Sequence, residues 1–369
     1  MTTLKDEVKA KILAQLAEKS GTSGTETAPI TGKPPTKKKE PLLDITLDHT
    51  DMLELEDIIG VSDSSGKKHY FKKDIVKTAT DWDATVQGMI PSAEYAEGYV
   101  WPIGPTITAL RGIENGMSVS LKGDTGTGKD ALYFALGHKL QWPVLRQMCI
   151  PGMEAPDIVG YDVPNGSGFL TVETQLSRAA KYGGIFLASE PNTLDAGTKF
   201  ALQGPLEFPP KLYRVGSMNP DDSGRACHPL FRYAQTTNTL GTGEDIDKFA
   251  GAAEIQDQSS LNRIGLFDEV GYLSATDEVE AVLAYKPQLS KIFVRKMVQL
   301  GNLIRNSREQ GALTLAWSMR QLRNWSDRIV IDGEPVNGFK QVYYNTLTST
   351  QKQLVERLWK DVNFEEYKL

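Results

Sequence analysis

Apolar and polar residues follow two different periods along this chain. Between residues 117 and 270, short apolar runs bounded by turn-forming residues alternate with stretches in which apolar side chains recur every three or four positions. The short runs are typical of buried strands, and the longer period is typical of helices. Strands are predicted at Ser118–Leu121, Val144–Cys149, Gly184–Ala188, Phe231–Gln235 and Leu266–Val270, with helices between them that include Ala131–Leu140, Thr174–Lys181 and Gly197–Gln203. This alternation predicts an α/β fold with a doubly wound, mainly parallel sheet.

The pattern becomes purely helical after about residue 275. Apolar side chains recur at helical spacing at Phe293, Met297, Leu300 and Ile304, and again within 322–329 and 354–362. A run of helices after an α/β core is typical of a helical lid on that core. We therefore predict an α/β core over 79–275 and a C-terminal helical lid over 276–369.

The N-terminal part of the chain differs in character from the rest. Residues 4–19 predict a short amphipathic helix, which either docks on a partner or lies loosely on the surface. Residues 20–40 are rich in Gly, Ser, Thr, Pro and Lys, as flexible linkers are. Together these stretches form a predicted first segment, 1–40. Residues 41–78 are mixed in composition and predict a small N-terminal appendage.

Composition narrows the class of protein. The chain has 41 lysine and arginine residues against 47 aspartate and glutamate residues, a net charge of −6, so nucleic acid is a disfavoured partner. Its two cysteines, Cys149 and Cys227, match neither a metal motif nor a disulfide framework, which suits a reducing compartment. It contains no run of 18 or more apolar residues. We expect a cytoplasmic protein with no membrane partner.

A glycine-rich loop lies between the first predicted strand and the helix that follows it. Its residues fit the pattern G-x-x-x-x-G-K-[ST] up to the lysine, and they are Gly123, Asp124, Thr125, Gly126, Thr127, Gly128, Lys129, Asp130 and Ala131. Glycines let backbone N–H groups turn inward around a phosphate, and the helix presents its positive N-terminal end. Lys129 is placed to reach the terminal phosphate oxygens as a point charge. The loop therefore predicts a nucleotide site.

Two positions of this site depart from the usual residue types. The pattern expects Ser or Thr after the lysine, and this chain has Asp130. In ATPases with this kind of loop, a second strand of the sheet ends in Asp-Glu. The equivalent strand here, predicted at Gly184–Ala188, is followed by Ser189 and Glu190. One carboxylate and one hydroxyl remain, with their positions exchanged. We predict that Asp130 and Ser189 hold Mg²⁺ and that Glu190 activates water. The alternative is a decayed site that binds nucleotide without turnover.

Three further polar residues follow at positions suited to catalysis. Asn238 comes directly after the strand predicted beside that of Glu190, where it would bond the attacking water or the γ-phosphate; a turn-forming Asn is the alternative. Arg263 precedes the last strand and is placed to reach a neighbouring subunit's γ-phosphate. Arg320 begins a lid helix and is placed to sense the same phosphate. Taken singly, each arginine is more typical of a surface ion pair.

This order of motifs resembles the AAA+ ATPases, and among them the MoxR-like branch and the CobS-like group of aerobic cobaltochelatase ATPase subunits. The stretches that carry the resemblance are Leu140–Pro143, Asp157–Gly160, Phe231–Gly241 and Ser318–Trp325, within roughly 80–345. The resemblance implies a ring, commonly of six subunits, with ATP at each subunit interface. Lys129, Asp130, Glu190, Asn238 and Arg320 would then act from one subunit and Arg263 from the next. Besides Asp130 and Ser189, Asn262 departs from the family's usual Asp.

The resemblance also bears on partners and function. MoxR-like ATPases commonly work with a protein that carries a von Willebrand A-type domain. The Gly-rich stretch Tyr161–Leu170 predicts a hairpin, which either contacts substrate or is a structural turn. The function expected first is a Mg²⁺-dependent ATPase that remodels a protein partner through ring motions. A chelatase motor for cobalt or magnesium and a nucleotide-gated scaffold that does not hydrolyse are the alternatives. A DNA-directed motor is disfavoured by the net charge.

Overall fold

The computed structural model describes residues 49–166, 168–213, 223–239 and 258–364. All described elements belong to one compact unit, Asp48–Leu369. The predicted helix over 4–19 and linker over 20–40 lie outside the described residues and stay predictions. Within the described ranges, no helix combines the length and the apolar character needed to span a membrane.

A five-stranded parallel sheet forms the centre of the fold. Its strands are β3 (Val119–Lys122), β4 (Val144–Met148), β7 (Gly184–Ser189), β10 (Phe231–Thr237) and β11 (Leu266–Glu269). They lie in the order β11-β3-β10-β7-β4, and every neighbouring pair is parallel. All five predicted strands are therefore confirmed. The carboxyl ends of β3, β10 and β7 lie side by side, which is the edge at which such sheets bind ligands.

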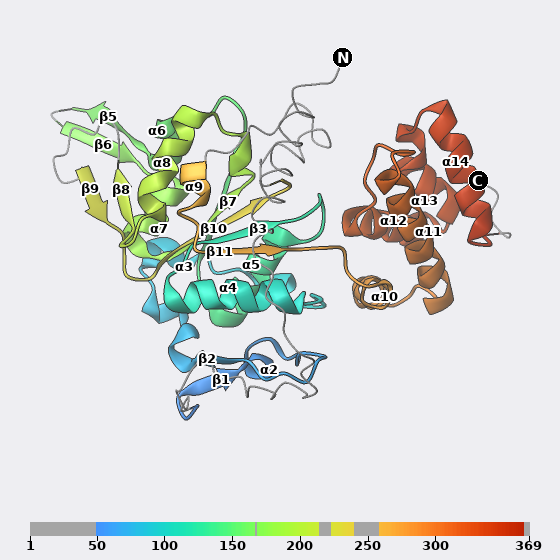
Figure 1. Ribbon diagram of the computed structural model, residues 1–369, viewed down its shortest axis with the longest axis horizontal. Helices are drawn as coiled ribbons and strands as arrows, with labels where there is room; N and C mark the ends of the chain where they lie inside the picture. The colour runs from blue at the N-terminus through green and yellow to red at the C-terminus, as the bar shows by residue number, and fades with distance from the viewer. Residues whose placement is uncertain (1–48, 167, 214–222, 240–257, 365–369) are drawn as a thin grey trace, which may run out of the picture. The chain divides into compact units, whose positions relative to one another are not determined.

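Helices cover both faces of this sheet, as Figure 1 shows. The main ones are α4 (Ile103–Asn115), α5 (Lys129–Leu140), α7 (Gln175–Tyr182) and α8 (Ala196–Leu206). From β3 to β4 the chain passes across β10 and β7 to the edge of the sheet. From β4 to β7 it runs in the opposite direction across the sheet. Right-handed crossovers therefore place α5 and α7 on opposite faces. All residues of β7 are buried, as expected for a central strand covered on both sides.

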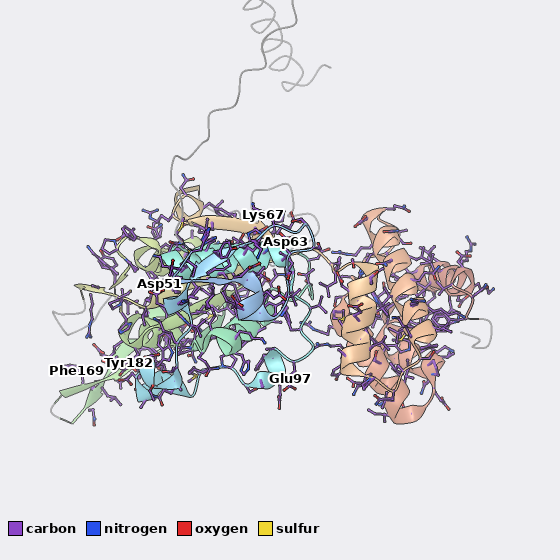
Figure 2. All side chains as sticks on the ribbon, turned by 90° about the horizontal axis from the view of Figure 1, so that it is seen from below. Asp51, Asp63, Lys67, Glu97, Phe169 and Tyr182 are labelled. Carbon is purple, nitrogen blue, oxygen red and sulfur yellow. The ribbon has the colours of Figure 1, made fainter. Side chains whose placement is uncertain are left out.

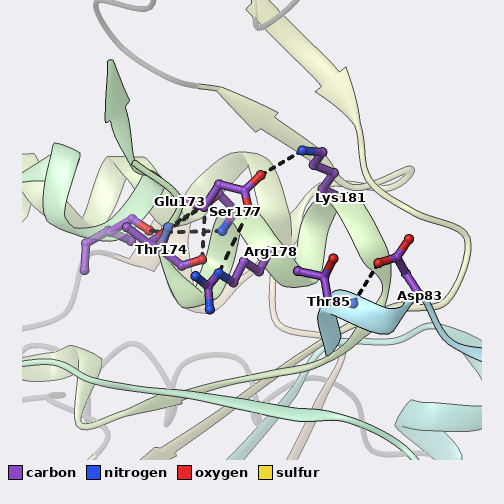
Figure 3. Close-up of polar contacts among 8 residues, drawn as sticks. Asp83, Thr85, Glu173, Thr174, Ser177, Arg178 and Lys181 are labelled. Atoms are coloured by element: carbon purple, nitrogen blue, oxygen red, sulfur yellow. Dashed lines mark hydrogen bonds and ion pairs between the residues drawn. The ribbon is translucent and has the colours of Figure 1, made fainter. Parts of the chain in front are cut away.

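Side-chain caps fix where the short helices begin. Thr174 precedes α7, and its hydroxyl accepts a hydrogen bond from the Ser177 N–H at 3.2 Å, while the Ser177 hydroxyl accepts from the Thr174 N–H at 2.7 Å (Figure 3). This reciprocal pair satisfies two N–H groups that the first turn leaves without partners. Asp83 caps α3 (Ala84–Gln87) in the same way by accepting from the Thr85 N–H at 2.8 Å.

Three pairs of short strands lie outside the main sheet. β1 (Met52–Glu54) pairs with β2 (Tyr70–Lys72), β5 (Tyr161–Asn165) with β6 (Gly168–Val172), and β8 (Lys211–Tyr213) with β9 (Ser223–Ala226). Phe71 of β2 is fully buried and belongs to the same apolar cluster as the main sheet. The predicted hairpin over 161–170 is confirmed by β5 and β6. Phe169 lies near its outer end and is 56% exposed (Figure 2).

The C-terminal lid is built around aromatic side chains. Its helices are α10 (Ala275–Tyr285), α11 (Lys291–Glu309), α12 (Met319–Asp332), α13 (Pro335–Val342) and α14 (Ser349–Asp361). Trp317, Trp325 and Phe339 pack together in a buried cluster separate from that of the sheet. A buried ion pair between Arg305 of α11 and Glu278 of α10 joins two of the helices. The predicted helical lid is thus confirmed.

Candidate functional site

The loop Gly123–Gly128 connects β3 to α5. A Cβ atom on Gly123 would collide with the Val270 carbonyl oxygen, and one on Gly126 with the Ser318 side chain. Gly126 also has a φ of +80°, which side chains disfavour. Only glycine therefore fits these two positions. Because α5 begins directly after the loop, its unpaired N–H groups and positive dipole end face the space that the loop encloses.

Lys129 places its ammonium group inside the loop. Its Nζ atom donates hydrogen bonds to the carbonyl oxygens of Gly123 at 2.6 Å and Asp124 at 3.0 Å, and to Asn238 Oδ1 at 2.9 Å. The side chain is buried, and this burial lowers the pKa of the ammonium, an effect that nearby carboxylates, chiefly that of Glu190, oppose. The three acceptors match the three N–H donors of the charged form. A phosphate entering the loop would therefore meet a positioned cation.

A second polar group surrounds the carboxylate of Asp130. Its Oδ2 atom accepts hydrogen bonds from the Ser189 hydroxyl at 2.8 Å and from Arg146 Nη2 at 2.7 Å. Its Oδ1 atom accepts from the Thr236 hydroxyl. Arg146 Nε also donates to Ser189 Oγ at 2.9 Å, so that the guanidinium grips both residues. The side chains that meet here come from β4, β7, β10 and the first turn of α5. We call these four residues the Asp130 cluster.

The donors of the Asp130 cluster do not fit a metal ion as they are arranged. A carboxylate offers about four lone-pair positions, and three donors, from Ser189, Arg146 and Thr236, already occupy Asp130. The Ser189 oxygen lies 2.9 Å from a guanidinium nitrogen, which would repel a divalent cation. No group of three or more His, Cys, Asp or Glu side chains suited to a metal occurs among the described residues. The Mg²⁺ roles of Asp130 and Ser189 stay predictions.

Glu190 lies at the carboxyl end of β7, next to the loop. Its backbone is in the left-handed region at φ 57°, which is uncommon for a residue with a side chain and typical of positions held for function. Its Oε2 atom accepts a hydrogen bond from the backbone N–H of Asn238 at 3.0 Å. Burial raises the pKa of the carboxyl group, while that hydrogen bond and the charge of Lys129 oppose the rise. Glu190 is therefore a stronger base than an exposed glutamate.

These groups line one cleft of about 690 Å³. The predicted site residues that line it are Thr125, Gly126, Thr127, Gly128, Lys129, Asp130, Ala131, Ser189, Glu190, Asn238 and Arg320. Aromatic rings lie on another wall, where Tyr95 stacks on Phe134 with ring centroids 4.8 Å apart. Flat aromatic surfaces of this kind suit a nucleotide base. Gly123 and Asp124 contact the cleft residue Lys129 through their carbonyl oxygens.

Arg263 is the predicted site residue that the structure places elsewhere. It follows α9 (Gln258–Leu261) and precedes β11, as the sequence predicted. Its carbonyl oxygen accepts a hydrogen bond from the Ser118 hydroxyl at 3.2 Å, close to the amino end of β3. Arg263 lines a different cavity of about 230 Å³ together with Phe208 and Tyr233. It does not line the cleft that contains Lys129.

Three contacts at the site were not predicted from the sequence. Arg146 and Thr236 bind Asp130, and Arg308 of the lid forms an ion pair with Asp124 at 3.0 Å. A signal for Arg146 was present, because it is the one charged residue in the apolar run 144–149. A charge within such a run needs a partner.

Comparisons with known proteins extend this description. No family model matches the chain. The chain is 24% identical over 284 residues to the aerobic cobaltochelatase subunit CobS of a Sinorhizobium species, a match that covers 72% of this chain and 83% of that protein. Among solved structures, a proposed ATPase from Cytophaga hutchinsonii is similar with a TM-score of 0.38 and 15% identity, over 77% of this chain and 93% of that one. NtrX from Brucella abortus in complex with ADP is similar with a TM-score of 0.43 and 13% identity, over 74% and 66%.

The match to CobS covers most of both proteins, and it agrees with the parts found in this structure. The parallel sheet, the glycine-rich loop between β3 and α5, and the helical lid occur in the predicted order. The resemblance to the CobS-like group that was drawn from the sequence is therefore confirmed.

Proposed function

We propose that this protein binds ATP in the cleft and hydrolyses it, with the phosphates in the glycine-rich loop and Glu190 as the base. The observation that carries the proposal is the position of Asn238. Its side-chain oxygen accepts from Lys129 Nζ at 2.9 Å, and its backbone N–H donates to Glu190 at 3.0 Å. One residue thus connects the cation that would hold the γ-phosphate to the base that would activate water.

The chemistry of the proposed reaction follows from these three residues. A water oxygen forms a bond to the γ-phosphorus while the bond between that phosphorus and the bridging oxygen of ADP breaks. The Glu190 carboxylate accepts a proton from the water. Lys129 offsets negative charge on the phosphate oxygens, and the Asn238 side chain is placed to orient the water or the phosphate. The products are ADP and inorganic phosphate.

A steady-state measurement of ATP turnover against pH tests this proposal. Because burial raises the pKa of Glu190, the group takes up its proton at a higher pH than an ordinary glutamate does. We expect kcat to be full where Glu190 is ionised and to fall as the pH decreases through that raised pKa. An acid limb at the position of an exposed carboxyl group contradicts the role of Glu190. Background turnover at every pH favours a scaffold that binds nucleotide without hydrolysis.

We further propose that the protein works as a ring, commonly of six subunits, with ATP at the interfaces. The position of Arg263 supports this proposal, since it lies outside the cleft of its own chain. An arginine that acts on the cleft of a neighbouring copy is expected to lie outside its own cleft. Ring motions would then act on a protein partner, and the exposed Phe169 at the end of the β5–β6 hairpin is one surface suited to that contact.

A chelatase motor is the second candidate, because the matched relative is a cobaltochelatase subunit. The described residues contain no group of three or more His, Cys, Asp or Glu that would hold the inserted ion. In this candidate another subunit would bind the ion, and this chain would supply ATP-driven motion. Cobalt insertion that requires this protein in a mixture with the partner subunits would favour the chelatase, whereas insertion at the same rate without it would exclude the role.

A further inference from the structure

The Asp130 cluster contains a positive charge at the place where this type of site usually binds a metal ion. Arg146 comes from β4 at the edge of the sheet, and its guanidinium contacts both residues predicted to hold Mg²⁺. Two nitrogens take part, Nη2 with Asp130 at 2.7 Å and Nε with Ser189 at 2.9 Å. Guanidinium stays protonated in proteins, so this charge is permanent.

Hydrogen bonds within the cluster also occupy the oxygen atoms of Asp130 and Ser189 that a metal ion would need. Asp130 accepts from Arg146, Ser189 and Thr236, and Ser189 both donates to Asp130 and accepts from Arg146. Asp130 and Arg146 together are electrically neutral, so a divalent cation gains no net attraction from the pair. For Asp130 to bind an ion, Arg146 would first have to leave two charge-assisted hydrogen bonds.

Arg146 also lines the cleft that contains Lys129 and Glu190. Its side chain is 38% exposed, and the cleft that it lines is the space proposed for the nucleotide. The positive charges that face this space include Lys129 and Arg320 as well. An anionic ligand therefore meets fixed cations of the chain itself.

We propose that Arg146 replaces the protein-bound metal ion of this site, so that nucleotide binding to the loop does not depend on a divalent cation. The inference rests on the nucleotide-binding part of the proposed function and concerns binding alone. It departs from the prediction that Asp130 and Ser189 hold Mg²⁺. The guanidinium of Arg146 neutralises the charge of Asp130. The ammonium group of Lys129 and the N-terminus of α5 hold the phosphates.

The test is a titration of the full chain with fluorescent methylanthraniloyl-ADP, once with excess Mg²⁺ and once with EDTA. For the wild type we expect the two values of Kd to differ by less than about threefold, since three hydrogen-bond donors already occupy the carboxylate of Asp130. In Arg146→Gln, which keeps length and polarity without the charge, Asp130 becomes free for the metal. We expect Mg²⁺ to tighten binding there by about tenfold or more, the scale on which groups around a ligand alter metal affinity. Arg178→Gln on α7 is the matched control and should behave as the wild type.

Direct binding of Mn²⁺ to the nucleotide-free protein, followed by electron paramagnetic resonance, gives a second measurement. We expect Mn²⁺ to bind Arg146→Gln more tightly than the wild type by a similar factor. A wild type that loses tenfold or more in ADP affinity on addition of EDTA overturns the inference, and this holds even if the variant does not fold. So does an Arg146→Gln protein that is no more metal-dependent than the wild type. Absence of nucleotide binding in both buffers would instead overturn the proposed nucleotide site and this inference with it.

Discussion

Replacing Glu190 by Gln is expected to lower kcat for ATP hydrolysis by about 10²- to 10⁴-fold, which is the usual contribution of a positioned general base. The amide keeps the shape of the side chain and still accepts the hydrogen bond from the Asn238 N–H. It cannot take a proton from water. We therefore expect the affinity for ATP to stay within a few-fold of the wild type, and the variant to retain ATP unhydrolysed.

The comparison is made by measuring Kd and kcat on the same preparations. Glu173→Gln, before α7 and outside the cleft, is a control that should leave both quantities unchanged. The acid limb of the pH profile should also vanish with Glu190→Gln, because the group that titrates is gone. Equal rates in the variant and the wild type would contradict the role of Glu190. A loss of ATP affinity that matches the loss of rate would instead show a structural role.

Replacing Arg263 by Ala is expected to lower kcat by about 10³- to 10⁵-fold, the range measured for arginines supplied from outside a phosphoryl-transfer site. Arg263 does not line the cleft of its own chain, so ATP affinity should change little. Such an arginine offsets the charge that develops on the phosphate only after a neighbouring copy closes over it.

A mixing experiment separates action between subunits from action within one. Lys129→Gln lacks the phosphate-binding ammonium but keeps Arg263, and Arg263→Ala has the converse defect. Adding the first variant to the second should restore part of the turnover if Arg263 acts on a neighbour. Failure of the mixture to recover any activity, together with a monomer in sedimentation with ATP, would contradict the ring. Arg357→Ala, on the exposed part of α14, is the control.

The main sheet was predictable because its strands are short apolar runs with sharp ends. β7 is buried throughout, and a strand covered on both faces leaves a continuous apolar signal in the sequence. The glycine-rich loop was equally visible, since it needs particular residues at fixed spacing. The Ser189 and Glu190 pair followed from its place at the end of that strand. Each of these predictions depends on residues that are close together in the sequence, so the pattern can be recognised without knowledge of the fold.

Features that depend on contacts between distant segments were not predictable in the same way. Thr236 escaped notice because the predicted strand ended at Gln235, whereas β10 continues to Thr237. The α13 helix contains Gly338, which weakens its sequence signal, and packing of Phe339 in the lid cluster stabilises it instead.

The partnership of Arg146 with Asp130 is the largest difference between expectation and structure. The two residues belong to different elements and meet only because β4 and α5 converge at the end of β7. The contact between these two residues cannot be inferred from their spacing in the sequence. Because a hydroxyl and a carboxylate have exchanged positions, the sequence predicted that Asp130 and Ser189 still hold a metal ion. In the structure, the Asp130 carboxylate is paired with the guanidinium of Arg146.

Equilibrium binding of ADP to the wild type and to Lys129→Gln, measured side by side by calorimetry, tests the central claim most directly. Hydrogen bonds between charged groups contribute about 1.5–3 kcal/mol each, so the variant should bind ADP about 10- to 100-fold more weakly than the wild type. The account predicts one ADP per chain in the wild type and that loss in the variant. A wild type that binds no ADP, or a variant that binds it equally well, would contradict the account.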